Sequence, residues 1–289
     1  MGYIEKKTIS GREYYYMTES KRIGKGKWKK TRKYLGTQLD KQSQLKSRIR
    51  PILTSQQIRI ADAIKTGYAA KYKIGKSLWR EKRERLVSFI FNTNAIEGNT
   101  LTYDETDSVL KGKNPPKAKK QDISEVVNMK KCIDFLFDYE GDIDEEFLLK
   151  LHGIQMQGVL QDAGKYRSVN VRVGNYLPPE HQKVPEKMAE FFKWLENARK
   201  TLHPFELAAL IHLKFVRVHP FRDGNGRMSR LLMNFTLMKR GYPLLNIFDA
   251  EKMLYYLVLR EVDYKKKEKP FVDYLFRVYA SQYKSFLME

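Results

Sequence analysis

The chain has 289 residues, and its 55 Lys and Arg against 34 Asp and Glu give a formal net charge of +21. This length allows one large domain with a hydrophobic core and a small appendage, and the single cysteine excludes an internal disulfide. Because the chain has neither an apolar run of about 18 residues nor an apolar signal region, we expect a cytoplasmic protein without membrane contact.

The first 50 residues differ from the rest in charge and in the kinds of residue they contain. They carry 15 Lys and Arg against 4 Asp and Glu, so just over half of the net charge lies in this segment. β-Branched and aromatic residues over 3–9, 13–23 and 28–35, separated by glycine-containing turns, predict a small basic three-stranded β-meander. Residues 41–51 are typical of a linker, and we place a domain boundary between residues 50 and 51.

Two interpretations of this meander stay open. Its Tyr and Trp side chains are interleaved with Lys and Arg and could stack on bases and bind phosphates, which would give residues 1–50 a weak nucleic-acid contact. Alternatively, the aromatic residues form the buried face of a small sheet while lysines protect its edge strands. The segment is then a docking or structural appendage.

From Ser55 onward, apolar residues recur at helical spacing, and short polar loops separate the periodic segments. Thr102, followed by acidic residues, is typical of a capped helix start. This succession predicts an all-α bundle for residues 51–289. The expected helices cover residues 55–91 with a break near Gly75, a short segment from Thr102, and then residues 123–139, 144–160, 186–200, 206–218, 225–240, 251–263 and 270–287.

Residues 91–102 contain a polar helix end. Thr93 and Glu97 are four residues apart and therefore share one face of a helix, and Gly98 is placed to end that helix. Taken alone, this pattern indicates a C-terminal turn with a solvated glutamate.

Residues 164–179 are the exception to the helical pattern. Val169, Val171 and Val173 alternate with polar residues, a Gly-Asn pair favours a tight turn, and two prolines close the segment. The pattern predicts a short β-hairpin, for which a plain surface role is the simplest alternative.

The run from His219 to Arg230 forms a corner between two apolar helical segments. A proline after His219 discourages the helical conformation there, and the turn formers that follow include two glycines that are free to adopt positive φ. The chain then enters a helix N-terminus, whose unpaired N–H groups and dipole favour an anion. Gly224, Asn225 and Gly226 therefore predict a phosphate-binding turn.

The side chains of the run supply candidate phosphate ligands, a candidate metal ligand and a candidate general base next to this turn. Arg227 and Arg230 share one helix face and can bind a polyphosphate. Asp223 offers a hard oxygen ligand for Mg²⁺, which usually accompanies nucleotide phosphates. His219 is a candidate general base because imidazole titrates near neutrality, and Phe221 is expected to anchor the loop in the core.

These residues form the pattern His-x-Phe-x-Asp-Gly-Asn-Gly-Arg-x-x-Arg, and the chain thereby resembles the Fic domain family. The resemblance implies a Fic-type helical bundle with its core over about residues 120–285, with ATP and Mg²⁺ (or Mn²⁺) bound at the run. It also implies transfer of AMP from ATP to a Tyr, Thr or Ser hydroxyl of a protein target, which can be the chain itself. Relatives that transfer a phosphoryl group have a lysine at the position of Gly226.

The resemblance also implies an inhibitory element in the same chain. The helix over about residues 85–98 is similar to the inhibitory helix of the subgroup that carries inhibitor and active site together, with the inhibitor N-terminal to the core. In that subgroup the glutamate pairs with the second arginine of the pattern, which here means Glu97 with Arg230, and Thr93 completes the motif.

Two further roles follow from the resemblance. The hairpin with Val169, Val171 and Val173 is similar to the flap that holds a target segment by strand addition. Tyr255 and Tyr256 fall where relatives line the pocket of the nucleotide base. Asp263 replaces an asparagine of some relatives, so the choice between ATP and another nucleotide stays open.

Three functions stay open on the sequence alone. The first is AMP transfer held off by Glu97, the second is removal of AMP from a modified protein with Glu97 orienting a water, and the third is a basic nucleic-acid-binding regulator that carries a Fic core. The complete run favours the first two, because a pure binding module needs no His219. The target protein is not identified by the sequence, and an oligomer is compatible with it.

Overall fold

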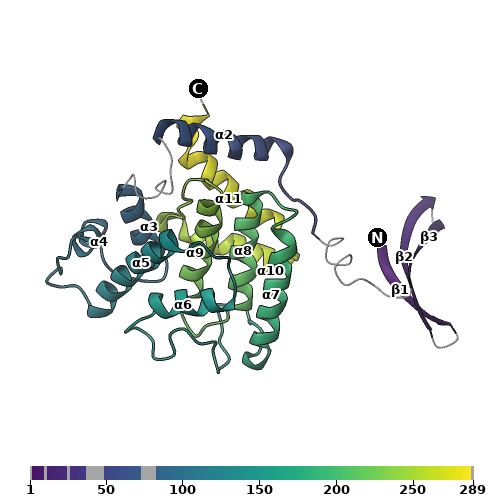
Figure 1. Ribbon diagram of the computed structural model, residues 1–289, viewed down its shortest axis with the longest axis horizontal. Helices are drawn as coiled ribbons and strands as arrows, with labels where there is room; N and C mark the ends of the chain where they lie inside the picture. Colours follow the sequence, from purple (N-terminus) through teal and green to yellow (C-terminus); the bar gives the residue numbers. More distant parts are fainter. Residues whose placement is uncertain (1, 10–11, 25–26, 37–48, 73–82, 288–289) are drawn as a thin grey trace. The chain divides into compact units, whose positions relative to one another are not determined.

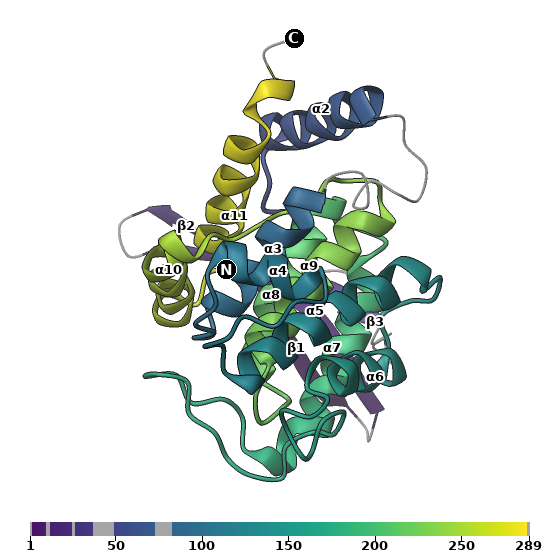
Figure 2. The same ribbon diagram turned by 90° about the vertical axis from the view of Figure 1, so that its left-hand side faces the viewer.

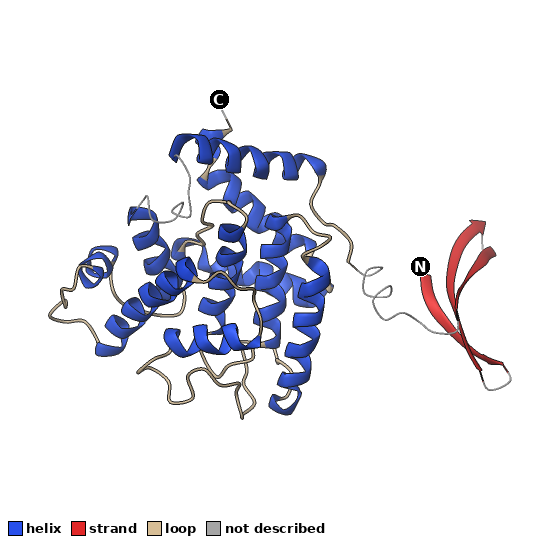
Figure 3. Ribbon diagram, in the orientation of Figure 1, coloured by secondary structure: helices blue, strands red, loops and turns tan. Residues whose placement is uncertain are grey.

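The computed structural model describes residues 2–9, 12–24, 27–36, 49–72 and 83–287. The chain divides into two compact units, Met1–Arg50 and Pro51–Glu289. Strands are drawn in the first unit and helices in the second (Figure 3).

The first unit is a three-stranded antiparallel sheet in the order β1-β2-β3, formed by β1 (Gly2–Ile9), β2 (Arg12–Gly24) and β3 (Lys27–Gly36). In its register, Glu5 of β1 lies opposite Tyr16 of β2, and Thr18 of β2 lies opposite Arg32 of β3. Near Tyr16 the pairing of β2 with β3 shifts by one residue, and such an irregularity increases the local twist. The predicted β-meander is confirmed.

The second unit is helical, which confirms the predicted all-α class. Its short 3₁₀ segments are η1 (His181–Lys183), η2 (Asp249–Glu251) and η3 (Lys284–Phe286). The α-helices are α2 (Ser55–Tyr72), α3 (Arg83–Ala95), α4 (Tyr103–Leu110), α5 (Lys120–Asp138), α6 (Glu145–Gln155), α7 (Val184–Ala198), α8 (Pro204–Val218), α9 (Asn225–Lys239), α10 (Lys252–Lys265) and α11 (Lys269–Gln282).

The helices α8 and α9 form the centre of this unit, and the other helices surround them (Figures 1 and 2). Every residue of α8 from Phe205 to Leu213 is buried, and so is every residue of α9 from Arg227 to Leu237. Helices buried on all sides belong to the middle of a bundle. The loop that joins them carries the His219–Arg230 run, so the run lies against the core of the unit.

Helix ends follow local signals where those signals are strong. Thr102 caps α4 by accepting a hydrogen bond from the backbone of Glu105, whose side chain in turn accepts one from the backbone of Thr102. Helix α6 ends at Gln155, five residues before the expected end, because Gly158 adopts a positive φ of 71° in the turn that follows. The break expected near Gly75 lies outside the described residues.

No helix in the described part of the chain is both long and apolar enough to cross a lipid bilayer.

Candidate active site

The loop between α8 and α9 is held in an uncommon backbone conformation. His219 ends α8 in the left-handed region with φ 51° and ψ 57°, and Gly224 starts α9 with φ 79°. The Asn225 side chain braces the loop, since its Oδ1 accepts from the Phe221 N–H at 3.0 Å and its Nδ2 donates to the Phe221 carbonyl at 2.9 Å. The structure therefore leaves the backbone of Asn225, and not its side chain, for a ligand at this turn.

The predicted base, His219, is held in one tautomer by its own helix. Its Nδ1 lies 3.2 Å from the Val216 carbonyl oxygen, and a carbonyl can only accept, so Nδ1 carries the proton and Nε2 keeps a free lone pair. Burial, with a further contribution from the Arg167 charge, lowers the pKa of His219 below its ordinary value, although the hydrogen bond to Val216 and the charges of Glu97 and Asp223 oppose the shift. The imidazole is therefore neutral near pH 7 and able to accept a proton.

The structure brings Thr93 and Glu97 to Arg230 across more than 130 residues of sequence. The Arg230 side chain is 1% exposed, its Nε donates to Thr93 Oγ1 at 2.7 Å, and its Nη2 donates to Glu97 Oε1 at 2.7 Å and to the Thr93 carbonyl at 2.9 Å. Burial alone would raise the pKa of the Glu97 carboxyl, but the charge and hydrogen bond of Arg230 lower it below its ordinary value. Glu97 is thus a carboxylate, paired with Arg230.

Arg227, the first arginine of the pattern His-x-Phe-x-Asp-Gly-Asn-Gly-Arg-x-x-Arg, has a partner that the sequence did not reveal. Arg227 Nη1 lies 3.1 Å from Glu125 Oε1, and the two side chains are 3% and 7% exposed. Asn99 Nδ2 donates to the other oxygen of Glu125 at 2.9 Å, and Gln121 Nε2 donates to Oε1 at 3.2 Å. The available signal was a glutamate among the inward-facing residues of α5, since buried acidic side chains are rare unless paired.

A second missed group supports the loop from α6. The His152 ring stacks on Phe221 with 3.6 Å between ring centroids, its Nδ1 accepts from the Gly164 N–H at 2.9 Å, and its Nε2 donates to the Asp223 carbonyl at 3.1 Å. Burial lowers the pKa of His152 to about 4, which keeps this donor and acceptor arrangement in place. Gln155 Nε2 donates to the Gly224 carbonyl at 3.2 Å.

Other side chains approach both glycines of the turn closely. A Cβ on Gly224 would meet the Met156 sulfur at 2.9 Å, and this glycine also needs its positive φ. A Cβ on Gly226 would lie 2.2 Å from Glu97 Oε1. The predicted turn and the predicted inhibitory carboxylate therefore occupy adjoining space.

Asp223 fits a magnesium ion that takes its other ligands from phosphate and water. Its side chain is exposed, and Oδ1 accepts from the Gly224 N–H at 2.6 Å, which leaves one carboxylate oxygen available. Among the residues that the structure describes, no cluster of three or more His, Cys, Asp or Glu side chains could hold a metal by itself. Magnesium usually keeps several waters and binds proteins through one or two carboxylates.

The aromatic pair on α10 is divided between the core and the surface. Tyr255 is 1% exposed, and its hydroxyl lies 2.9 Å from His212 Nε2. Tyr256 is 39% exposed and donates to the Ile96 carbonyl at 3.2 Å, next to Glu97. Tyr255 thus packs as a core residue, and Tyr256 is the member of the pair that keeps exposed surface.

Asp263, which replaces the asparagine expected from relatives, accepts from Arg217 Nε at 3.0 Å and from Arg217 Nη2 at 2.7 Å. The side chains of Arg217 and Asp263 are each 26% exposed. The departure from the relatives' pattern is thus accompanied by an ion pair between α8 and α10.

The expected hairpin is present only at its turn. Val173 and Tyr176 exchange backbone hydrogen bonds of 3.0 and 2.9 Å, whereas Val169 and Val171 belong to no strand. The next paired positions on the returning chain would include Pro178 and Pro179, which have no N–H to donate. Val169 and Val173 are nevertheless exposed, at 47% and 41%.

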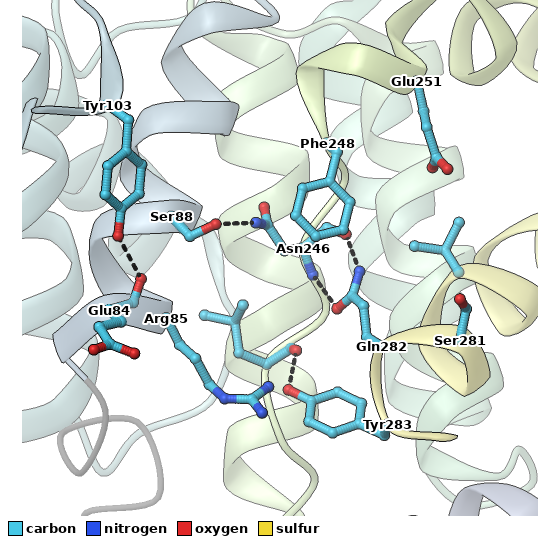
Figure 4. A pocket seen from close by; sticks show the side chains of 12 residues that line it. Glu84, Arg85, Ser88, Tyr103, Asn246, Phe248, Glu251, Ser281, Gln282 and Tyr283 are labelled. Carbon is cyan, nitrogen blue, oxygen red and sulfur yellow. Dashed lines mark hydrogen bonds between the residues drawn. The ribbon is translucent and has the colours of Figure 1, made fainter. Parts of the chain in front are cut away.

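A separate cavity of about 600 Å³ lies between α3, the segment before α10, and α11 (Figure 4). None of the predicted site residues lines it. Several of its polar groups pair with one another, because Asn246 Nδ2 donates to Ser88 Oγ at 3.0 Å and the Asn246 N–H donates to Gln282 Oε1 at 3.1 Å. These bonds fasten α3, which leads to Glu97, to the body of the bundle.

Together, the fold and the site define an all-α unit whose central helix pair presents a glycine-containing turn, a neutral histidine and two buried arginines. Residues 142–237 match the Fic/DOC family. Protein adenylyltransferase Fic from Drosophila melanogaster is 33% identical over 229 residues, which are 77% of this chain and 46% of that protein. The corresponding protein of Drosophila ananassae is 32% identical over the same coverage, so the chain spans about half the length of these relatives.

Two solved structures share the fold. A Fic family protein from Desulfovibrio desulfuricans G20 has a TM-score of 0.69 and 28% identity over 83% of this chain and 77% of that one. Fic-1 from C. elegans has a TM-score of 0.71 and 27% identity over 81% of this chain and 71% of that one. The chain therefore belongs to the Fic family.

Proposed function

We propose that this chain transfers AMP from ATP to a hydroxyl side chain of a protein. The observation that carries the proposal is His219, a neutral imidazole with a free Nε2, at the entrance to a glycine turn that opens a helix. The relatives named protein adenylyltransferase Fic support it. The chain spans 46% of their length, so their activity is inferred for it and has to be measured.

The phosphate end of the site is supported by two unsatisfied donors. Arg227 Nε and Arg230 Nη1 are buried without a hydrogen-bond partner in the described part of the chain. A buried donor without a partner costs about 1–3 kcal/mol, and phosphate oxygens would remove that penalty. We place the α- and β-phosphates of ATP over the amides of Gly224 to Gly226, with the arginines toward the β and γ end.

Asp223 is the residue that would hold Mg²⁺ or Mn²⁺, through its available carboxylate oxygen. When bound, the ion would offset the negative charge of the polyphosphate and favour departure of pyrophosphate.

The transfer step assigns one proton to His219. Nε2 takes the proton from a Tyr, Thr or Ser hydroxyl, and the hydroxyl oxygen attacks the α-phosphorus in line with the leaving group. The bond from the α-phosphorus to the bridging oxygen breaks, and pyrophosphate leaves with its charge stabilised by loop amides and arginines. The flap residues Val169, Val171 and Val173 would hold the target segment beside His219.

The same geometry supports autoinhibition by Glu97. Its carboxylate engages Arg230 Nη2 at 2.7 Å, which removes a donor that a γ-phosphate would use and places negative charge where a polyanion must sit. We therefore propose that Glu97, positioned by the Thr93–Arg230 contacts, holds the transferase in a state of low activity.

Removal of AMP from a modified protein is the second candidate reaction. The Glu97 carboxylate supports it, because it lies against the turn at Gly226 and would be able to orient an attacking water there. Incubating AMP-modified protein with the wild type and with Glu97→Gln would separate the reactions, because hydrolysis needs the carboxylate and transfer does not.

The central test is labelling with α-³²P-ATP, followed by mass spectrometry of the labelled proteins. Glu97→Gly should raise labelling, self-modification included, by tens to thousands of times, since each 1.4 kcal/mol of lost repulsion and competition is about tenfold. Adding His219→Ala to that variant should reduce labelling roughly 100-fold or more, while ATP binding persists because the phosphate contacts come from other residues.

Glu84→Gly is the matched control, since it removes an exposed glutamate from α3, the helix that leads to Glu97. It should leave labelling at the wild-type level. Equal labelling by wild type and Glu97→Gly at saturating ATP and magnesium would refute autoinhibition, and equal labelling with and without His219 would refute the assigned base.

A further inference from the structure

A buried arginine outside the His219–Arg230 run lies directly behind its loop. Arg167 is 2% exposed, and its three kinds of side-chain nitrogen all donate to backbone carbonyls. Nε donates to His219 at 2.8 Å, Nη1 to Val169 at 2.9 Å, and Nη2 to Pro179. The Arg167 N–H donates to the Pro220 carbonyl at 2.9 Å.

This arrangement is unusual for a buried charge. No carboxylate in the described part of the chain forms an ion pair with Arg167, and burial alone accounts for its lowered pKa. Core filling would be served by Leu or Met without the cost of desolvating a guanidinium. What Arg167 supplies is a planar fork of donors, which can hold several carbonyls in fixed relative positions at once.

Two of its bonds act on the conformation of His219. In the described part of the chain, His219 and Lys266 are the non-glycine residues with positive φ, a conformation that persists only where the surroundings enforce it. The Arg167 side chain binds the carbonyl of His219, and its backbone N–H binds that of the next residue, so residue 167 holds both peptide groups that follow the histidine. The Nδ1–H bond to Val216 depends on that backbone position.

The other two bonds act on the flap. The carbonyls of Val169 and Pro179 lie at the two ends of the flap segment, ten residues apart, and the two ends of one guanidinium hold them. The segment has a single backbone bridge, at its turn, so no strand ladder joins its two sides. Arg167 takes the place of that ladder at the base of the flap.

We propose that Arg167 is a positioning residue that joins the general base and the target-holding flap into one rigid unit. This rests on the proposed transfer reaction, in which an acceptor hydroxyl on the flap must lie in hydrogen-bond reach of His219 Nε2. A single side chain then sets the separation between the base and the edge that carries the acceptor. Misplacement by about 1 Å can cost about 100-fold in rate.

The test replaces Arg167 in the Glu97→Gly background. Arg167→Met keeps the length and removes every side-chain donor, while the backbone bond to Pro220 stays. Arg167→Lys keeps the charge but cannot span three carbonyls. Arg199→Met is the matched control, because Arg199 also donates to a backbone carbonyl, that of Ile143 at 3.2 Å, far from the run. Self-labelling with α-³²P-ATP should fall about 100-fold in Arg167→Met and at least tenfold in Arg167→Lys, with the KM for ATP unchanged.

A second measurement does not depend on activity. Imidazole ¹⁵N NMR of the Glu97→Gly protein should show His219 with Nδ1 protonated and His152 with Nε2 protonated, the opposite tautomer. In Arg167→Met the His219 signals should move toward exchange between tautomers, while His152 keeps its own and reports an intact loop support. Arg199→Met should change neither histidine.

The outcomes separate this proposal from the proposed function. If no variant labels any protein but the His219 signals change in Arg167→Met alone, the positioning role stands and the transfer reaction does not. Unchanged His219 signals with labelling within twofold of the parent would overturn the proposal. Full activity in Arg167→Lys, or parallel changes at His219 and His152, would overturn it too, since charge alone or general loss of structure would then explain the effect.

Discussion

At the scale of single residues, the chemical state of the His219–Arg230 run is set by partners outside it. Arg167 holds the carbonyl of His219 from 52 positions away in sequence. Glu125 fixes Arg227, and Thr93 with Glu97 fixes Arg230. The residue types of the run indicate phosphate chemistry, but which arginine nitrogens stay free depends on side chains that only the fold brings near.

One prediction at this scale is the pH dependence of transfer. The pKa of His219 is lowered by burial and by Arg167, so the neutral, active imidazole persists to a lower pH than an ordinary histidine would allow. Glu97 opposes the shift, so Glu97→Gly should lower the pKa further. A pH–rate profile of this variant should have its acid limb below pH 6.5, and a midpoint above 6.5 would contradict the assignment.

At the scale of elements, the anchoring of α3 decides where Glu97 lies. Asn92 Oδ1 accepts from the Asp249 N–H at 2.8 Å, and Asn92 Nδ2 donates to the Ser88 carbonyl at 2.7 Å. Tyr256 of α10 holds the Ile96 carbonyl. The proposed inhibitory carboxylate, which lies in the turn just after α3, is thus positioned by hydrogen bonds of that helix and of the adjoining Ile96.

The corresponding prediction concerns Asn92→Ala. It leaves the Asp249 N–H without its partner and should lower the free energy of unfolding by about 1–3 kcal/mol. Because α3 loosens, self-labelling should rise in the wild-type background and stay unchanged in the Glu97→Gly background. Asn197→Ala is the control, since Asn197 is also 6% exposed and donates to a carbonyl one helical turn away, in α7. A rise with Asn197→Ala as well would mean that general destabilisation causes it.

Much of the fold at this scale follows from sequence periodicity, and the exceptions have local causes. The central helices α8 and α9 begin and end within two residues of expectation because capping, proline and glycine signals bound them. The sequence predicted a longer hairpin than the structure contains, because the alternating valines carry no information about the returning chain. There, Pro178 and Pro179 have no N–H to donate to a strand partner. Tyr255 and Tyr256 show that adjacent aromatic residues on one helix point to different surroundings, which periodicity alone does not assign to core or ligand.

At the scale of the whole molecule, buried histidines link stability to pH. The folded state keeps His152 neutral down to a pKa of about 4, whereas an unfolded histidine titrates near 6.5. As pH falls through 6.5 the unfolded state takes up a proton that the folded state refuses, so stability falls until pH 4 and then levels off. The His152 contribution should amount to about 2 kcal/mol between pH 7 and pH 5.

Urea unfolding at pH 7 and pH 5 checks this value. The His152→Gln variant keeps an acceptor and a donor but does not titrate, so it should lose about 2 kcal/mol less than the wild type between the two pH values. An equal loss in both proteins would show that His152 does not carry the effect.

The charge distribution leads to a prediction about the first unit. Residues 1–50 hold 15 basic and 4 acidic side chains, and we predict that they add nucleic-acid affinity. Removing them should weaken binding to duplex or single strands and reduce the salt dependence by about 0.9 for each lost phosphate contact with a duplex. Fluorescence anisotropy at several salt concentrations measures both. Unchanged binding after truncation would instead assign the segment to docking or structure.

Glu97 Oε1 lies 2.2 Å from the position that a Cβ on residue 226 would take. This close approach affects which mutations can arise at residue 226. Any missense change at the codon for Gly226 adds a side chain that displaces the Glu97 carboxylate. The same side chain then stands where phosphate oxygens must approach the turn. Under the proposed autoinhibition, a substitution of Gly226 would therefore remove the inhibitory contact and obstruct phosphate binding together, so we expect activating mutations at Glu97 or Thr93 but not at Gly226.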